Sequence, residues 1–172
     1  MAGSPKGTEG PRGARGPGRL LRRVDDVDVA VWQDGLDTAV RRRPSLVLLD
    51  VEPYVAPWLT GQDDLDAGVA RLAARWSDQP VLVVTNSDRV VSTHVLPAHW
   101  GQVNVARKPF TRLQVPPGAV VVGDQPLQDG LLAWRYRATF VRVPLPAGAP
   151  WYARATYRVF APLSRLWLRP PR

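Results

Sequence analysis

Polar residues that could carry chemistry follow four apolar segments of this 172-residue chain. Each apolar segment is of the kind that forms a buried β-strand. The polar residues are, in chain order, Asp50 and Glu52, then Thr85 and Asn86, then Lys108, and finally Asp124 and Asp129. A single aspartate after a strand is more often a helix cap. Carboxylates, a hydroxyl and a lysine at four strand ends form a much rarer set.

This set matches what phosphoryl transfer through an aspartyl-phosphate requires. A carboxylate acts as the nucleophile on phosphorus, and Mg²⁺ held by oxygen ligands offsets the repulsion between the two anions. A hydroxyl and a lysine hold the non-bridging phosphate oxygens as their charge changes. A second acid protonates the leaving oxygen and later helps to activate water. The residue types therefore predict magnesium-dependent chemistry on a phosphorylated substrate.

The elements that must position these residues alternate between strands and helices. Strands are predicted at residues 46–49, 81–84, 103–105, 119–122 and 139–143, and helices at residues 34–43, 63–76, 127–134 and 151–168. Asp34 is expected to cap the first helix. The alternation predicts an α/β fold, doubly wound and Rossmann-like, with a mostly parallel sheet and helices on both faces. Ligands of such sheets bind at the carboxyl ends of the strands, where these polar residues stand.

Two regions are predicted along the chain. Residues 1–19 are rich in Gly, Pro and Arg and are expected to form a disordered tail. Residues 20–172 are expected to form one domain that ends in a basic helix, because their length suits a single core.

Four motifs carry a family resemblance. The stretch from Asp50 to Trp58 is similar to D-x-D-N-T-L-V-P-W, and the strand that ends in Thr85-Asn86 is similar to a second motif. Lys108-Pro109 matches a third motif, and the most specific match is Val121-Val122-Gly123-Asp124-Gln125 followed by Asp129. With these motifs, over about residues 20–168, the chain resembles the haloacid dehalogenase superfamily of phosphatases, and more narrowly its YqeG-like IIIA branch. The resemblance implies a capless phosphomonoester hydrolase with Mg²⁺ as cofactor.

The resemblance also implies a role for each matching residue. Asp50 would be the nucleophile and a magnesium ligand. Thr85-Asn86 and Lys108 would bind the phosphate group. Asp124 would ligate magnesium, and Asp129 would support the metal site or hold Lys108.

The chain departs from the family pattern just after Asp50. Glu52 stands where the family has its second aspartate, the acid–base residue that also contributes to the metal site, and Pro53-Tyr54 stands where the family has a smaller Asn-Thr pair. The additional methylene of Glu52 can displace its acid by about a bond length, and a misplacement of about 1 Å can cost about 100-fold in rate. Both an active phosphatase and a degenerate site are therefore compatible with the sequence.

A response-regulator receiver domain is the main structural alternative. Residues 43–50 and Lys108-Pro109-Phe110 resemble the phospho-acceptor strand and the lysine motif of that family. A receiver needs an acidic pair on a strand one βα unit earlier, whereas Asp25-Asp26 stand too close upstream, without such a unit before them. A receiver would also end soon after its lysine, whereas this chain continues into the motif at residues 123–129. These two features favour the phosphatase.

Composition excludes several other classes of protein. The chain has no cysteine and two histidines, which excludes disulfides, thiolate zinc sites and a histidine-rich metal centre. Residues 24–130 carry nine basic and fourteen acidic residues, so we expect no specific binding of nucleic acid. No apolar run is long enough to span a membrane, and the N-terminus has no apolar signal region, so a cytoplasmic location is expected.

The helix predicted at residues 151–168 offers a third, non-catalytic alternative. Residues 131–172 hold eight basic residues and no acidic residue, and the helix interleaves its arginines with aromatic and aliphatic residues. The favoured interpretation is that it packs on the sheet and exposes its arginines to water. The alternative is peripheral contact with an anionic membrane surface. That alternative would fit a lipid phosphate substrate, since proteins similar to the YqeG-like branch include a phosphatidylglycerophosphate phosphatase.

Overall fold

A computed structural model describes residues 23–28, 32–53, 55–58 and 60–169 of the chain. The predicted tail at residues 1–19 and the side chain of Tyr54 lie outside the described residues. No helix in these described ranges combines the length and the apolar character that crossing a lipid bilayer requires.

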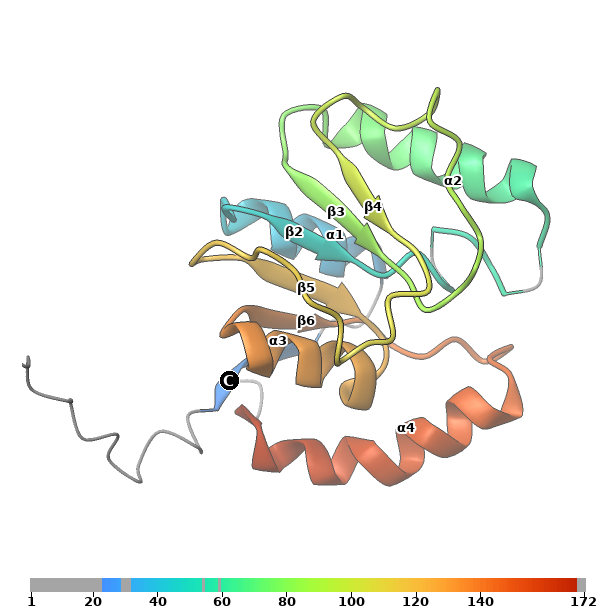
Figure 1. Ribbon diagram of the computed structural model, residues 1–172. Helices are drawn as coiled ribbons and strands as arrows, with labels where there is room; N and C mark the ends of the chain where they lie inside the picture. Colours follow the sequence, from blue (N-terminus) through green and yellow to red (C-terminus); the bar gives the residue numbers. More distant parts are fainter. Residues whose placement is uncertain (1–22, 29–31, 54, 59, 170–172) are drawn as a thin grey trace, which may run out of the picture.

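The described strands form one parallel sheet in the order β4-β3-β2-β5-β6-β1-β7. The arrowheads of β2, β3, β4 and β5 point the same way in Figure 1. The strands are β1 (Val24–Asp28), β2 (Val47–Leu49), β3 (Val81–Val84), β4 (Gly101–Val103), β5 (Val120–Gly123), β6 (Thr139–Arg142) and β7 (Leu168–Arg169). The sheet and its helices confirm the predicted α/β, Rossmann-like class.

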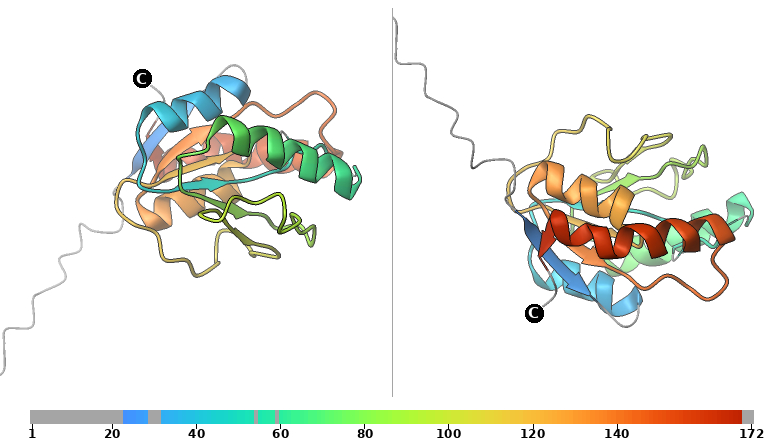
Figure 2. Two further views of the ribbon diagram at one scale, coloured as in Figure 1. Left: turned by 90° about the horizontal axis from the view of Figure 1, so that it is seen from above. Right: turned by 90° about the horizontal axis from the view of Figure 1, so that it is seen from below.

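Helices connect the strands and cover both faces of the sheet (Figure 2). They are α1 (Trp32–Arg41), α2 (Gln62–Arg75), α3 (Leu131–Tyr136) and α4 (Trp151–Leu163), with a π-helical turn η2 (Pro126–Gly130) before α3 and a 3₁₀ turn η3 (Ser164–Leu166) after α4. The helix α1 begins at Trp32, so Asp34 lies inside the helix and the prediction that it caps the helix is wrong.

The central strands are apolar throughout because both of their faces are buried. Along β2, Val47 and Leu49 join one apolar cluster with α1 and α2, while Leu48 joins a second cluster with α3 and β7. Successive side chains of a strand point to opposite faces, so a continuous apolar run supplies both clusters. Because β2, β3 and β5 run parallel, their carboxyl ends lie at one edge of the sheet.

Strand register brings the predicted site residues together at that edge. Leu49 of β2 pairs with Val83 of β3 on one side and with Val122 of β5 on the other. The residues that follow these three strands therefore emerge side by side. They include Asp50, Thr85 and Asp124, as the sequence predicted from the polarity of strand ends.

The strand β1 was not predicted, the helix predicted at residues 151–168 ends at Leu163 and is followed by η3 and β7, and the strand predicted at residues 103–105 is β4 at residues 101–103. The sequence of β1 is Val-Asp-Asp-Val-Asp, which carries too many carboxylates to look like a buried strand. Asp26 is nevertheless buried and forms an ion pair with Arg142 of the neighbouring strand β6. Because β1 and α1 precede β2, a strand–helix unit does stand upstream of Asp50, contrary to the sequence-based expectation.

Candidate functional site

Lys108 lies at the centre of the candidate site. Its ammonium Nζ is 2.6 Å from Oδ2 of Asp50 and 2.7 Å from Oδ1 of Asp129, and its side chain is 1% exposed. Three separate segments of the chain supply these charges, since Asp50 follows β2, Lys108 follows β4, and Asp129 belongs to η2. Of the two roles that the sequence left open for Asp129, the contact with Lys108 is compatible with holding the lysine, and the oxygen cluster described next is compatible with supporting a metal.

Three carboxylates form a cluster around this lysine. Each of Asp50, Asp124 and Asp129 offers one oxygen that lies within 4.8 Å of the others, and Asp124 and Asp129 are buried. One ammonium cannot balance three ionised carboxylates, so the cluster has the charge and the oxygen donors that suit a divalent cation such as Mg²⁺. The side chain of Glu52, also predicted as a ligand, does not belong to this cluster.

The turn after β5 explains why Asp129 reaches the cluster. Oδ2 of Asp129 accepts a hydrogen bond from the backbone N–H of Gln125 at 3.1 Å, and the backbone N–H of Asp129 donates to the carbonyl of Gln125 at 2.8 Å. The carboxylate lies directly over Gly123, where any Cβ would overlap it. The Gly-Asp sequence at residues 123–124 therefore creates the space for a carboxylate further along the chain.

Burial and mutual repulsion shift the pKa values of the cluster. Burial first, and then the charge of Asp129, raise the pKa of Asp124 from 3.8 to about 7. Burial also raises the pKa of Asp50 well above its ordinary value, although Lys108 acts in the opposite direction. Burial alone would lower the pKa of Lys108, but the two carboxylates outweigh burial and raise it. A bound cation would relieve the repulsion and favour ionised carboxylates.

The two polar residues after β3 have different positions in the site. Thr85 is buried, and its Oγ1 accepts a hydrogen bond from the backbone N–H of Ser87 at 3.0 Å, so its own proton can be donated to an anion. Oδ1 of Asn86 accepts from the backbone N–H of Lys108 at 2.7 Å, and Nδ2 donates to Gln128 at 3.0 Å. Asn86, predicted to bind substrate, thus holds the lysine loop in place.

The loop that carries Lys108 has a strained backbone. Val105 and Arg107 have φ angles of 47° and 52°, a left-handed conformation that β-branched valine strongly disfavours. Hydrogen bonds from Val105 N to Ser87 O and from Ala106 N to Thr85 O tie this loop to the end of β3. Strain of this kind persists where surrounding structure enforces it, and it concentrates at functional sites.

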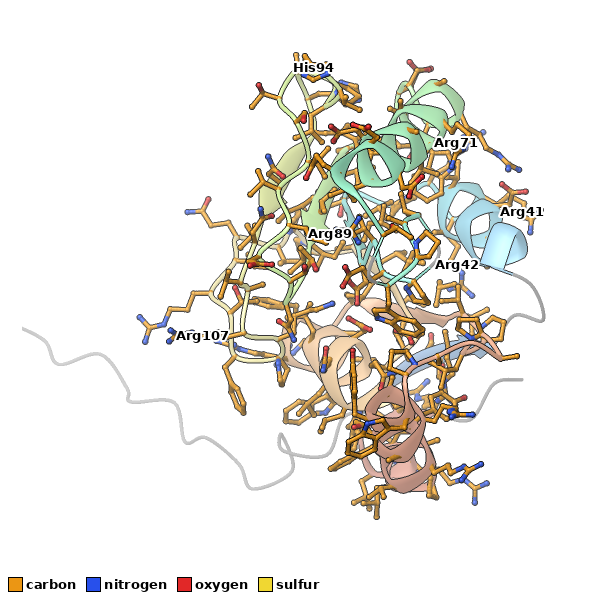
Figure 3. The ribbon with its side chains drawn as sticks, turned by 90° about the vertical axis from the view of Figure 1, so that its right-hand side faces the viewer. Arg41, Arg42, Arg71, Arg89, His94 and Arg107 are labelled. Atoms are coloured by element: carbon orange, nitrogen blue, oxygen red, sulfur yellow. The ribbon has the colours of Figure 1, made fainter. Side chains whose placement is uncertain are left out.

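Glu52 belongs to a different group of contacts from the three aspartates. Its Oε1 accepts a hydrogen bond from Nη1 of Arg89 at 2.9 Å, and both side chains are largely buried. Arg89 also donates to the backbone carbonyls of Pro57 and Gly61, so it joins the loop after β2 to the loop after β3. Figure 3 looks onto this edge of the sheet and shows Arg89 near its centre, with Arg107 and His94 at the rim.

A cavity of about 180 Å³ opens over these groups. Of the predicted site residues, Asp50, Glu52, Thr85, Asn86 and Asp124 line it, and Trp58 forms part of its wall, as the sequence predicted. Lys108 and Asp129 are not part of the lining, but Lys108 contacts Asp50, which lines the cavity, and Asp129 contacts Lys108. The helix α4 contributes residues that the sequence did not point to, namely Tyr152, Ala153 and Thr156.

Two further residues near the site were also missed. Arg89 gave no signal because it is one of many arginines in the chain and no motif includes it. Gln128 stands between Asp124 and Asp129 in a segment that was predicted as an ordinary helix. A π-helical turn often marks a functional site, but its presence cannot be inferred from these residue types.

Comparison of the chain with protein-family models, with curated proteins and with solved structures finds no match in any of the three.

Proposed function

We propose that this protein is a magnesium-dependent phosphatase that hydrolyses a phosphomonoester through an aspartyl-phosphate on Asp50. The observation that carries the proposal is the position of Lys108, whose ammonium bridges the candidate nucleophile and Asp129 beside a cavity. The four sequence motifs that resemble haloacid dehalogenase phosphatases supply the second line of support. The strand order, in which β2 lies between β3 and β5, suits the same chemistry.

In the first step, a carboxylate oxygen of Asp50 attacks phosphorus and forms a P–O bond while the bond to the leaving oxygen breaks. Lys108, 2.6 Å from Asp50, would stabilise the negative charge around the transferred group. The Thr85 hydroxyl, which lines the cavity, would donate to a phosphate oxygen. In the second step, water attacks phosphorus, releases inorganic phosphate and restores the Asp50 carboxylate.

The three aspartates are the residues that would hold the cation. Mg²⁺ prefers oxygen ligands, and the carboxylates of Asp50, Asp124 and Asp129 are within reach of one common point. When bound, the ion supplies the positive charge that lowers the repulsion between nucleophile and phosphate. Lys108 cannot supply all of that charge because Asp129 already shares it.

Glu52 is the proposed acid–base residue, and its contact with Arg89 limits it. The oxygen Oε1 that would exchange a proton with the leaving group is engaged by the guanidinium at 2.9 Å. Glu52 also lines the cavity, so a modest rotation would bring it toward a substrate. We therefore expect a slow phosphatase, and one that becomes faster when the acid is released from Arg89.

The receiver-like alternative is weakened by the strand order. A receiver places its acidic pair on a strand beside the phospho-acceptor strand, whereas β5 and β6 separate β1 from β2. Asp26 is committed to Arg142, and Asp25 forms an ion pair with Arg169 at 3.3 Å. Neither carboxylate can therefore contribute to the site around Asp50.

The test is hydrolysis of an aryl phosphate with Mg²⁺ or with EDTA. We would compare the wild type with Asp50→Asn, Glu52→Asp and Arg89→Met, and with Asp78→Asn as a control at an exposed turn. We expect magnesium-dependent turnover in the wild type, loss of turnover in Asp50→Asn, and no change in Asp78→Asn. Glu52→Asp withdraws the carboxylate from the guanidinium and should raise turnover by up to about 100-fold.

Covalent labelling separates the alternatives. Acetyl phosphate would be added to the wild type and to Asp50→Asn, and acid-stable protein phosphate would be measured alongside released phosphate. Labelling of Asp50 with continuing release supports the phosphatase. Labelling of Asp50 that stops at one phosphate per chain supports a phospho-acceptor. Turnover that survives in Asp50→Asn would refute the proposed nucleophile.

A further inference from the structure

An exposed apolar face on α4 and η3 has no partner within the described chain. Among the described residues, eight large hydrophobic side chains are exposed, and five of them lie in this one segment. We call these five the docking face: Trp151 at 75% exposure, Tyr152 at 53%, Val159 at 55%, Leu163 at 46% and Leu166 at 62%. Their concentration in sixteen residues of sequence, 151–166, sets this segment apart from the rest of the surface.

Helical geometry makes the docking face continuous. At 3.6 residues per turn, its five side chains fall within a sector of about 120° around the helix axis. The opposite side of the helix is the one that packs on the domain, where Ala153 and Ser164 are buried. In Figure 2, seen from below, α4 lies on the outside of the fold, in front of the sheet, and it contacts η2. The apolar sector therefore faces outward.

Arginines border the docking face along one side. Arg154, Arg158 and Arg165 are exposed and fall next to the apolar sector on the helical wheel, between it and the buried side. Residues 131–172 contain no aspartate or glutamate that could pair with them. The helix thus has three sides, one buried, one apolar and exposed, and one basic and exposed.

We infer that the docking face binds an anionic lipid bilayer surface. Apolar side chains of such a helix enter the boundary between headgroups and acyl chains, while flanking arginines pair with lipid phosphates. Tryptophan and tyrosine favour this interfacial depth, and both stand at the start of α4. The chain's formal charge of +8 adds long-range attraction to the same surface.

A second copy of the chain is a poorer occupant of this face. A symmetric dimer brings identical patches together. Two α4 helices paired through their apolar sectors would place the arginine borders of both copies close together, with no acidic side chain from residues 131–172 between them. The arginines of the two copies would repel each other in such a dimer, whereas an anionic bilayer would attract the same arginines.

The position of the docking face has a consequence for the cavity. Tyr152 belongs to the docking face and also lines the cavity above Asp50, together with Thr156 from the next turn of α4. A chain bound through α4 would therefore hold the cavity at the bilayer surface. Bilayer binding itself does not depend on the proposed phosphatase activity, so the two can be tested separately.

The experiment is flotation of the full-length chain with vesicles of phosphatidylcholine, with and without phosphatidylserine. We expect flotation with phosphatidylserine, and weaker flotation without it or at high salt. Arg158→Gln with Arg165→Gln should weaken binding by about fivefold for each arginine removed. Val159→Ser with Leu163→Ser should abolish most of the binding, because both side chains would enter the lipid.

Matched controls distinguish the loss of charge or apolar surface on α4 from a general effect of such substitutions or from unfolding. Arg71→Gln with Arg107→Gln removes two exposed arginines that lie outside α4 and η3. Val90→Ser removes an apolar side chain that is 51% exposed and is distant from α4 in the sequence. The Val90→Ser variant should float like the wild type, the arginine pair should do so unless Arg107, at the rim of the site, also meets the bilayer, and urea unfolding should show that all variants are folded. The basic segment at residues 1–22 is kept in every variant, so binding through that segment would survive the changes in α4.

Fluorescence quenching gives a second readout. Brominated lipids should quench the wild type more than Trp151→Phe, because Trp151 would lie at the depth of the bromine atoms. Equal quenching of the two proteins, or flotation that the α4 variants leave unchanged, would overturn the inference. It would also be overturned if sedimentation finds a dimer that Val159→Ser with Leu163→Ser dissociates while vesicles bind no protein.

Discussion

The substitution Asp124→Asn should stabilise the metal-free protein although it removes a candidate metal ligand. Asp124 is 2% exposed, and burial together with the charge of Asp129 raises its pKa from 3.8 to about 7. Asparagine has nearly the shape of the protonated carboxyl and can still accept the hydrogen bond that Gln125 donates to Asp124 at 3.1 Å. The variant therefore imitates the form that the folded protein prefers.

The sign and the size of the effect follow from proton linkage. Between pH 3.8 and about 7 the folded chain keeps a proton on Asp124 that the unfolded chain has lost. The free energy of unfolding must then fall as pH rises through this window. The two pKa values differ by about three pH units, and each unit corresponds to about 1.4 kcal/mol, so the full penalty is about 4 kcal/mol.

Urea unfolding in EDTA measures this penalty. From about pH 5 to about pH 8 the wild type should lose about 3 kcal/mol through Asp124, which is the part of the penalty that lies above pH 5. Asp124→Asn should lack this loss and should be the more stable protein at the higher pH. Mg²⁺ should stabilise the wild type increasingly as pH rises, because the ion and the proton compete for the carboxylates, and should stabilise the variant much less.

The exposed Asp78→Asn substitution is the control for the removal of one carboxylate, and its pH dependence should equal that of the wild type. The reasoning fails if Asp124→Asn is less stable than the wild type in EDTA at about pH 8. It also fails if both proteins lose the same stability between the two pH values.

Three further substitutions test the packing and charge of the site. Lys108→Met removes the ammonium group that bridges two carboxylates, and should lower the free energy of unfolding by about 3–5 kcal/mol near pH 7. Urea unfolding near pH 5 should show a smaller loss of stability, because the carboxyls take up protons there. An equal loss at both pH values would contradict this reasoning. Gly123→Ala should lower the free energy of unfolding by about 1–3 kcal/mol, because its Cβ pushes the Asp129 carboxylate aside. Gly148→Ala is the control, since its Cβ meets no atom within 4 Å, and its stability in thermal unfolding should differ from that of the wild type by no more than about 0.5 kcal/mol. Gly68→Ala should be more costly than Gly123→Ala, since its Cβ would meet a backbone carbonyl of the loop after β2 that cannot rotate away; a thermal midpoint above that of Gly123→Ala would show that the loop yields.

The central part of the sheet could be predicted from the sequence because β2, β3 and β5 are simple apolar runs. Residues 81–84 form β3 as predicted, and β2, β5 and β6 agree to within one residue at each end. The gathering of Asp50, Thr85 and Asp124 followed from the general rule that parallel strands end at one edge. The register of the sheet then placed them side by side without any further information from the sequence.

The parts that could not be predicted depend on contacts between distant polar residues. The strand β1 buries Asp26, which forms an ion pair with Arg142, and the two residues are 116 positions apart. The contact of Glu52 with Arg89 likewise joins two loops, and neither residue carries a local signal for the other. Sequence patterns depend on residues that are close along the chain. They therefore indicate apolar strands well, but they do not indicate ion pairs between residues that are distant in the sequence.

The place of β1 in the sheet also has a consequence for biosynthesis. Asp26 of β1 pairs with Phe140 of β6, and Val24 pairs with Leu168 of β7, so both partners of this early strand are made more than a hundred residues later. On the ribosome, the segment at residues 24–28 must therefore wait with its backbone groups unpaired while β2, β3 and β5 assemble. The interval exposes an acidic strand rather than an apolar one. The carboxylates that make β1 difficult to predict from the sequence would thus also keep the segment at residues 24–28 soluble until β6 and β7 have been synthesised.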